Sequence, residues 1–185
     1  SGLMSSYKRN KKLKQLKDLS HGDRGLLSNA RCLSEGIDVP SLDGVAFIDP
    51  KGSQVDIVQA VGRSIRLSEE KTLGTIFLPV FIKDGDDAKI SIQSSNFKPV
   101  WTVINALKSH DHDLSIELDQ LRTNLGKSHG FGKIKGIPKV IFDLPRTLPE
   151  SFTDSLKSIL VEKTTASWNF WFGLLENYVD KNGDA

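Results

Sequence analysis

Three polar residues in the segment QAVGRSIR, residues 59–66, could together bind a polyanion. Gln59, Arg63 and Arg66 recur at spacings of four and three, so on a helix they lie on one face. A guanidinium is planar, permanently charged and able to form several hydrogen bonds at once, which suits a phosphate group. Gly62 removes a side chain beside the arginines and permits close approach of a ligand. The spacing is compatible with a phosphate-binding surface, and also with an exposed helix whose arginines form salt bridges.

A second candidate site is the segment SNARCLSEGIDVP, residues 28–40. Gly36 permits close backbone approach, and Asp38 can accept two hydrogen bonds, as from the hydroxyls of a ribose. The single cysteine, Cys32, lies in the same segment. One cysteine excludes an internal disulfide and a multi-cysteine metal site, and we expect it to be a buried apolar thiol.

The elements that must position these segments alternate between strands and helices. Apolar residues at helical spacing predict a helix over residues 5–20, and short apolar runs predict strands over 25–29, 44–48 and 74–81. A helix over residues 53–62 would connect the second and third strands. This order predicts an α/β fold with a parallel sheet. Because the run 74–81 is almost entirely apolar, it predicts a strand covered on both faces.

The composition changes after Ile82, where the polar stretch 83–96 predicts a linker or an insertion. Apolar spacing beyond it predicts helices over residues 97–108, 114–125, 150–163 and 168–179 and a strand over 139–144. Residues 126–138 are rich in glycine and in basic side chains. They predict a loop that either contacts a phosphate backbone or is simply mobile.

Composition and charge exclude several classes of protein. The 185 residues are 38% hydrophobic and 26% charged, which excludes disordered and collagenous chains. No apolar run approaches the roughly 18 residues of a membrane span, so we expect no membrane contact. The pattern His110-Asp111-His112-Asp113 has metal-ligating residue types but alternates too closely for one helical face, and we expect a solvated turn and no metal site.

The net charge of +2 gives no global signal for nucleic acid, but the basic residues are unevenly distributed. Residues 8–17 contain six cations and no acid. They are Lys8, Arg9, Lys11, Lys12, Lys14 and Lys17. This stretch predicts either a solvated helix face or a strip that faces phosphates.

The segments 28–40 and 59–66 resemble motifs V and VI of the second RecA-like domain of superfamily 2 helicases and translocases, which include the DEAD/DEAH and restriction-type enzymes. The resemblance covers roughly residues 5–82. It implies a RecA-like parallel sheet flanked by helices, followed here by a mainly helical C-terminal extension. It also implies that Arg66 is the arginine finger, with Arg63 beside it, and that Gln59 links the nucleotide to the interdomain contacts.

The same resemblance implies roles for the residues of segment 28–40. Gly36 and Asp38 would line the nucleotide side of the cleft. Glu35 would be an electrostatic partner of an arginine or a solvated acid. The nucleic-acid backbone would lie against Ser28, Asn29 and Arg31. Many relatives have threonine where this chain has Ala30, which removes one hydroxyl contact to phosphate.

The resemblance implies ATP and Mg²⁺ as cofactors, but the sequence has no GxxxxGK[ST] phosphate loop and no DEAD-like acidic box. We therefore expect both to be bound mainly by a first RecA-like domain upstream in the same polypeptide. The chain would be a fragment of a longer protein and inactive alone as an ATPase.

The segment Trp168 to Tyr178, followed by Asn182-Gly183, resembles the opening of a helicase-associated repeat, a nucleic-acid-binding module. An aromatic stripe that packs in the core is the alternative. The predicted domains are a truncated second RecA-like domain over 1–82, a helical extension over 83–163 and the start of the repeat over 164–185.

Together these features predict the C-terminal motor half of an ATP-dependent helicase or translocase, an enzyme when joined to its first domain. Its partner would be a nucleic-acid backbone, with DNA favoured over RNA, and its location the bacterial cytoplasm. The alternative is a non-catalytic nucleic-acid or protein interaction module whose motor motifs are relics, using the basic loop and the aromatic tail.

Overall fold

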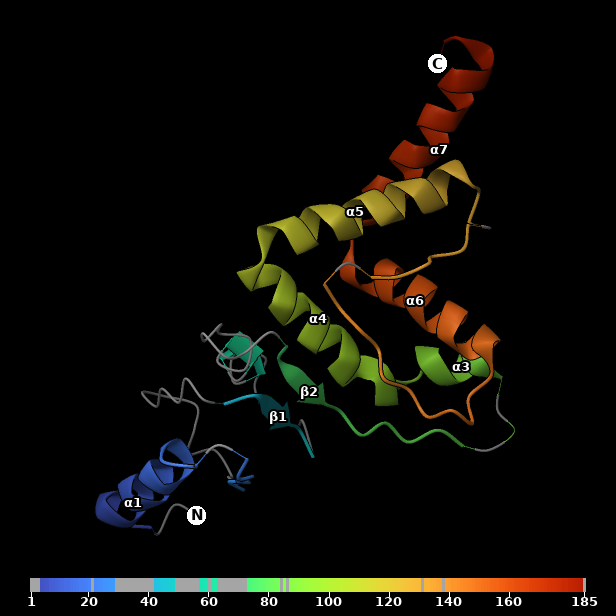
Figure 1. Ribbon diagram of the computed structural model, residues 1–185. Helices are drawn as coiled ribbons and strands as arrows, with labels where there is room; N and C mark the ends of the chain where they lie inside the picture. Colours follow the sequence, from blue (N-terminus) through green and yellow to red (C-terminus); the bar gives the residue numbers. More distant parts are fainter. Residues whose placement is uncertain are drawn as a thin grey trace. The chain divides into compact units, whose positions relative to one another are not determined.

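The computed structural model describes residues 4–20, 22–28, 42–48, 57–59, 61–62, 73–83, 85, 87–130, 132–137 and 139–184. The chain forms two compact units, residues 1–79 and residues 80–185 (Figure 1). The three predicted domains stay predictions. Within the described ranges, no helix has the length and apolar character needed to cross a membrane.

The first unit begins with helix α1, Ser6–Lys17, as the apolar spacing predicts. The Ser5 hydroxyl caps the helix by accepting a hydrogen bond from the Lys8 N–H at 3.4 Å. Leu13 is the buried residue of α1. The rest of its surface is almost entirely polar and exposed, so α1 is held to the unit by a narrow apolar contact.

Two short strands, β1 (Gly44–Ala46) and β2 (Thr75–Phe77), pair in parallel with Val45 opposite Ile76. Hydrogen bonds from Thr75 N–H to the Asp43 carbonyl and from Phe47 N–H to the Phe77 carbonyl extend the ladder at both ends. Residues 57–59 and 61–62, which lie between the strands in sequence, are helical. The predicted strand–helix–strand order and the parallel pairing are therefore confirmed in this part of the unit.

Two predictions about the first unit are wrong. Residues 25–28 form no strand, and Leu26 is 91% exposed. An apolar pair beside a glycine has no periodicity, and a strand also needs a neighbour to accept its N–H groups. Strand β2 is not covered on both faces by the described residues, because Phe77 is 58% exposed. An apolar run indicates that burial of both faces of a strand is favourable, but other parts of the chain must supply the residues that bury them.

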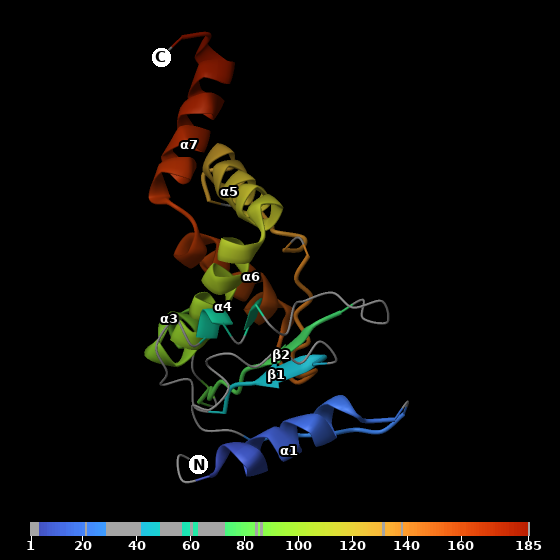
Figure 2. The same cartoon turned by 90° about the vertical axis from the view of Figure 1, so that its left-hand side faces the viewer.

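The second unit is helical, and its four predicted helices are confirmed. It contains α3 (Ala88–Gln93), the short 3-10 helix η1 (Ser95–Phe97), α4 (Lys98–His110), α5 (His112–Lys127), α6 (Glu150–Thr164) and α7 (Ser167–Asn182). Figure 2 shows α3, α4 and α6 gathered together, with α5 and α7 side by side beyond them.

The polar stretch 83–96 is not merely a linker, since it contains α3 and η1. Asp87 caps α3 by accepting hydrogen bonds from the N–H groups of Lys89 and Ile90, and Ile92 is completely buried. The predicted strand over 139–144 is also wrong. Ile137 and Val140 form an isolated bridge, and Lys139 between them has a left-handed φ of 58°, which interrupts an extended backbone.

Two apolar clusters form the core of the second unit. Ile104, Leu118 and Leu160 belong to the cluster shared by α4, α5 and α6, where Leu118 and Leu160 are fully buried. Phe97 and Phe152 belong to the second cluster, with ring centroids 6.2 Å apart. These clusters fix the relative positions of the helices to which the last helix, α7, is attached.

Helix α7 crosses α5 through two glycines that allow the backbones to touch. An added Cβ at Gly126 would overlap the Phe170 carbonyl and lie 3.1 Å from the Cα of Gly173. An added Cβ at Gly173 would overlap the Thr123 carbonyl in the same way. Around this crossing, the Arg122 guanidinium lies 4.8 Å from the centroid of the Phe170 ring. The Asn177 amide donates to the Lys127 carbonyl at 2.6 Å.

The crossing predicts that Gly173→Ala destabilises the second unit. Alanine favours a helix over glycine by about 1 kcal/mol, but forcing the backbones apart costs more, so we expect a net loss of about 2 kcal/mol. Urea unfolding followed by circular dichroism measures the free energy of unfolding. Gly136→Ala is the control, because nothing lies within 4 Å of its added Cβ. A Gly173→Ala protein as stable as the wild type would contradict the close crossing.

Asp111 joins two parts of the second unit at the start of α5. Its carboxylate accepts from the Leu114 N–H at 3.0 Å, which caps the helix. It also accepts from Lys139 Nζ at 2.8 and 2.9 Å. The hydrogen bond from Lys139 is the main cause that lowers the pKa of Asp111 below 3.8, and the same bond raises the pKa of Lys139 above 10.5.

These shifts predict a pH window of stability. Asp111 stabilises the fold above its unfolded pKa of 3.8, and this is lost as the pH falls through its lowered folded pKa. Lys139 stabilises the fold below pH 10.5, its unfolded pKa. This stabilisation is lost as the pH rises through the raised pKa of Lys139 in the folded state. Asp111→Asn keeps a capping acceptor and loses the charge. Its free energy of unfolding should be lower than wild type at neutral pH and should converge with wild type in acid.

Denaturant unfolding over a pH series measures this difference. Asp143→Asn is the matched control, because Asp143 is exposed and forms no ion pair with any described residue. Its difference from wild type should stay flat with pH. A flat profile for Asp111→Asn as well would show that the Lys139 contact adds nothing to stability.

Candidate functional site

The structure describes two of the predicted site residues, Ser28 and Gln59. The others lie outside the described residues, and their roles stay predictions. They are Asn29, Arg31, Glu35, Gly36, Asp38, Arg63 and Arg66. Cys32 also lies outside the described part of the chain.

Gln59 lies in the helical residues between the two parallel strands. Ile57 and Val61, two residues to either side, are 5% and 0% exposed and anchor this helical segment in the unit. Gln59 itself is half-buried. Its side-chain oxygen Oε1 is buried and has no hydrogen-bond partner among the described residues.

An unpartnered buried oxygen is unusual, since buried polar atoms are nearly always hydrogen-bonded. Ser91, Glu117 and Arg122 each have a buried side-chain atom of the same kind among the described residues, so the feature alone does not mark a site. The role of Gln59 in linking the nucleotide to a second domain stays a prediction.

Ser28 is exposed at the end of the irregular residues 22–28. Exposure is what a contact from a hydroxyl to a phosphate backbone needs. The strand that the sequence predicts to hold Ser28 is not formed by residues 25–28.

The cations of α1 form the largest uninterrupted group of charges in the first unit. All six are exposed, and none forms an ion pair with a described residue. They are Lys8, Arg9, Lys11, Lys12, Lys14 and Lys17. The sequence alone allows a solvated face or a phosphate-facing strip, and the exposed surface is available for either.

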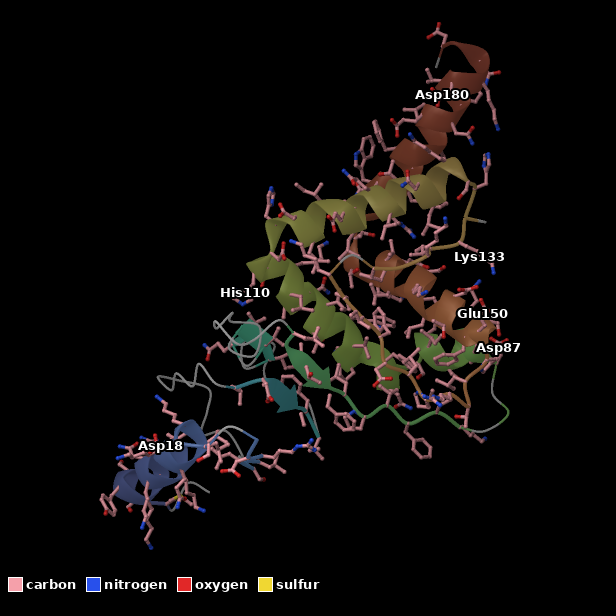
Figure 3. All side chains as sticks on the ribbon, in the orientation of Figure 1. Asp18, Asp87, His110, Lys133, Glu150 and Asp180 are labelled. Carbon is pink, nitrogen blue, oxygen red and sulfur yellow. The ribbon has the colours of Figure 1, made fainter. Side chains whose placement is uncertain are left out.

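The basic loop of the second unit is engaged with acids of the same unit. Lys133 Nζ lies 3.2 Å from Asp154, whose hydrogen bond raises the pKa of Lys133. Figure 3 labels Lys133 on this loop and Glu150 at the start of α6. Lys127 Nζ lies 3.4 Å from Glu176. These ion pairs lie at the surface and partly neutralise the charge that the loop can offer to a phosphate backbone.

The described residues contain no group of three His, Cys, Asp or Glu side chains placed to hold a metal ion. The pattern at residues 110–113 joins two helices, since His110 ends α4, Asp111 caps α5, and His112 and Asp113 begin it. Of the aromatic stripe considered as an alternative for α7, Phe170 packs against the core. Trp168, Trp171 and Tyr178 are 67%, 63% and 56% exposed, so most of the aromatic segment is not core.

Comparisons with known proteins agree with the two motifs. Residues 1–68 match the family described as the helicase conserved C-terminal domain. A probable helicase of African swine fever virus is 40% identical over 86 residues, which are 46% of this chain and 9% of the viral protein. The same match recurs in other isolates of the virus.

A solved structure is similar over nearly the whole chain. It is the ATP-dependent type ISP restriction-modification enzyme LlaBIII bound to DNA, with a TM-score of 0.64 and 34% sequence identity. The match covers 97% of this chain and 12% of that enzyme, so the chain spans a small part of each relative. The resemblance to the C-terminal domain of superfamily 2 helicases, restriction-type enzymes among them, is confirmed. The start of a helicase-associated repeat stays a prediction.

The unpartnered oxygen of Gln59 predicts that Gln59→Met does not destabilise the fold. Removing a buried acceptor that has no donor is neutral or stabilising, by up to about 1 kcal/mol. Urea unfolding measures the change, with Gln93→Met on the exposed surface of α3 as control. A loss of more than about 1 kcal/mol at Gln59 alone would mean that its side chain already has a partner within the chain.

Proposed function

We propose that this relative of the superfamily 2 helicases is the C-terminal motor half of an ATP-dependent DNA helicase or translocase. The observation that supports it most strongly is the match of residues 1–68 to the helicase conserved C-terminal domain. The parallel β1–helix–β2 unit, with the unpartnered oxygen of Gln59 on its helix, fits the same function.

The proposed role of the arginines follows from their position relative to Gln59. Arg63 and Arg66 lie four and seven residues after Gln59, which keeps all three on one face if the helix continues. Two guanidiniums on such a face would attract the terminal phosphates of a nucleotide bound to a neighbouring domain. Arg66 would act as the arginine finger, with Arg63 beside it. Gln59 would hydrogen-bond across the same contact.

The cofactors would be ATP and Mg²⁺, held mainly by a first RecA-like domain. The chemistry that they supply is cleavage of the terminal phosphoanhydride bond, with the metal ion neutralising charge on the phosphates. This chain would add Gly36 and Asp38 along the nucleotide, with Glu35 as an electrostatic partner of an arginine. Nucleotide binding would thereby favour the closed arrangement of the two domains.

The nucleic-acid contact would be made by Ser28, Asn29 and Arg31 on the phosphate backbone. Such contacts are independent of sequence and weaken as the salt concentration rises. We assign DNA as the nucleic acid because the similar restriction-modification enzyme is described as bound to DNA. Closing of the cleft would then strengthen binding to one DNA strand, and opening would weaken it.

The test is the rate of ATP hydrolysis by the longer polypeptide that contains the first domain. Arg66→Ala should lower the DNA-stimulated rate by about 10³-fold or more, because a finger of this kind contributes 10³–10⁵ in related hydrolases. Arg146→Ala, at an exposed position of the second unit, is the control and should leave the rate unchanged. Single-stranded and duplex DNA and RNA are compared as activators.

If Arg66→Ala hydrolyses ATP within about threefold of the wild-type rate, Arg66 is not the arginine finger. The absence of hydrolysis with every nucleic acid would favour the second candidate, a non-catalytic interaction module. The exposed aromatic side chains of α7 support that candidate, since Trp168, Trp171 and Tyr178 offer a surface for a partner.

A further inference from the structure

The basic face of α1 has charges that pair with no acid in the described part of the chain. Helix α1 contains no acidic residue, and its six cations are all exposed. None of them forms an ion pair with a described residue, in contrast to Lys127, Lys133 and Lys139 of the second unit. Figure 3 shows nitrogen-tipped side chains spreading from this helix, whose end is marked by Asp18.

The helix geometry gathers three of these lysines into one row. Lys8, Lys11 and Lys14 follow at intervals of three, so neighbouring members of the row lie about one turn apart. Lys8 and Lys11 lie on the side of the helix away from the buried Leu13. The row is about 9 Å long at 1.5 Å per residue. Tyr7 is 78% exposed and lies one turn before Lys11.

This arrangement destabilises the helix that carries it. Like charges three and four residues apart repel one another on a helix surface. Lys8 and Arg9 also lie near the positive N-terminal end, where the helix dipole favours acids. A polyanion would remove both penalties, because it places negative charge along the whole row. Lys14 and Lys17 lie in the last turn, where the dipole favours cations, so the unfavourable charges that a ligand would compensate are those of the first turns.

We propose that the row Lys8, Lys11 and Lys14 binds the phosphate backbone of DNA, at a contact additional to the one assigned to residues 28–31. The choice of DNA as the polyanion rests on the proposed function. The charge complementarity comes from α1 itself. Each strand of duplex DNA carries one phosphate per about 3.4 Å of the axis, so a row about 9 Å long spans about three phosphates of one strand. The row turns by roughly 60° around the helix at each step, which the long lysine side chains can accommodate. The contact is independent of base sequence.

The test measures binding of the 185-residue chain to a fluorescein-labelled duplex of about 30 base pairs by anisotropy, over a range of salt concentrations. The row variant is Lys8→Gln, Lys11→Gln and Lys14→Gln. The control variant is Lys83→Gln, Lys89→Gln and Lys163→Gln. It makes the same change in net charge at exposed lysines of the second unit. Glutamine is a good helix former, so α1 is retained, and circular dichroism checks it.

The row variant should bind about tenfold or more weakly at low salt, and its salt slope should fall by about three in magnitude, one for each lost phosphate contact. The control should stay within about twofold of wild type. Equal losses in both variants, or no loss in the row variant, would overturn the proposal. Binding of labelled poly-glutamate as tight as that of DNA, lost in the row variant, would also overturn it in favour of an acidic protein.

The outcome can be separated from that of the proposed function. In the longer polypeptide, the row variant should raise the DNA concentration needed for half-maximal ATP turnover and leave the rate at saturating DNA unchanged. If Arg66→Ala does not lower ATP hydrolysis, the anisotropy measurement still tests the row. If the row variant binds DNA normally, the Arg66→Ala measurement still tests the proposed function.

Discussion

The parallel pairing of β1 and β2 is the constraint on which the candidate site depends. Parallel strands cannot be joined by a tight turn, so the chain between Ala46 and Thr75 must cross from one end of the pair to the other. The helical residues 57–59 and 61–62 belong to this crossing, and Ile57 and Val61 bury its inner side. Gln59 is thereby held at a half-buried position, where its buried side-chain oxygen has no hydrogen-bond partner among the described residues.

The second unit depends in a comparable way on the contact between Gly126 and Gly173. Without side chains at these positions, α5 and α7 approach until backbone meets backbone. The Phe170 ring beneath Arg122 and the Asn177 hydrogen bond to Lys127 then set how the helices cross. Because α7 uses this narrow face for packing, its other large aromatic side chains, Trp168, Trp171 and Tyr178 among them, remain exposed.

Charge is used differently in the two units. In the second unit, Lys127, Lys133 and Lys139 each lie close to an acid and stabilise the connections between helices. In the first unit, the cations of α1 have no such partner among the described residues and weaken their own helix. The overall charge of +2 conceals this contrast, since interactions depend on which acids lie within a few ångströms of each cation.

The sequence by itself determined the helices with clear apolar spacing, the parallel strand–helix–strand order and the similarity to the helicase C-terminal domain, because these depend on local periodicity and on short motifs. It could not determine whether residues 25–28 or 139–144 become strands, since a strand exists only where another supplies its hydrogen bonds. It also did not reveal that the basic loop pairs with Asp154 and Glu176, or that two distant glycines meet. Those features join residues far apart in the chain, and only the tertiary structure brings them within contact.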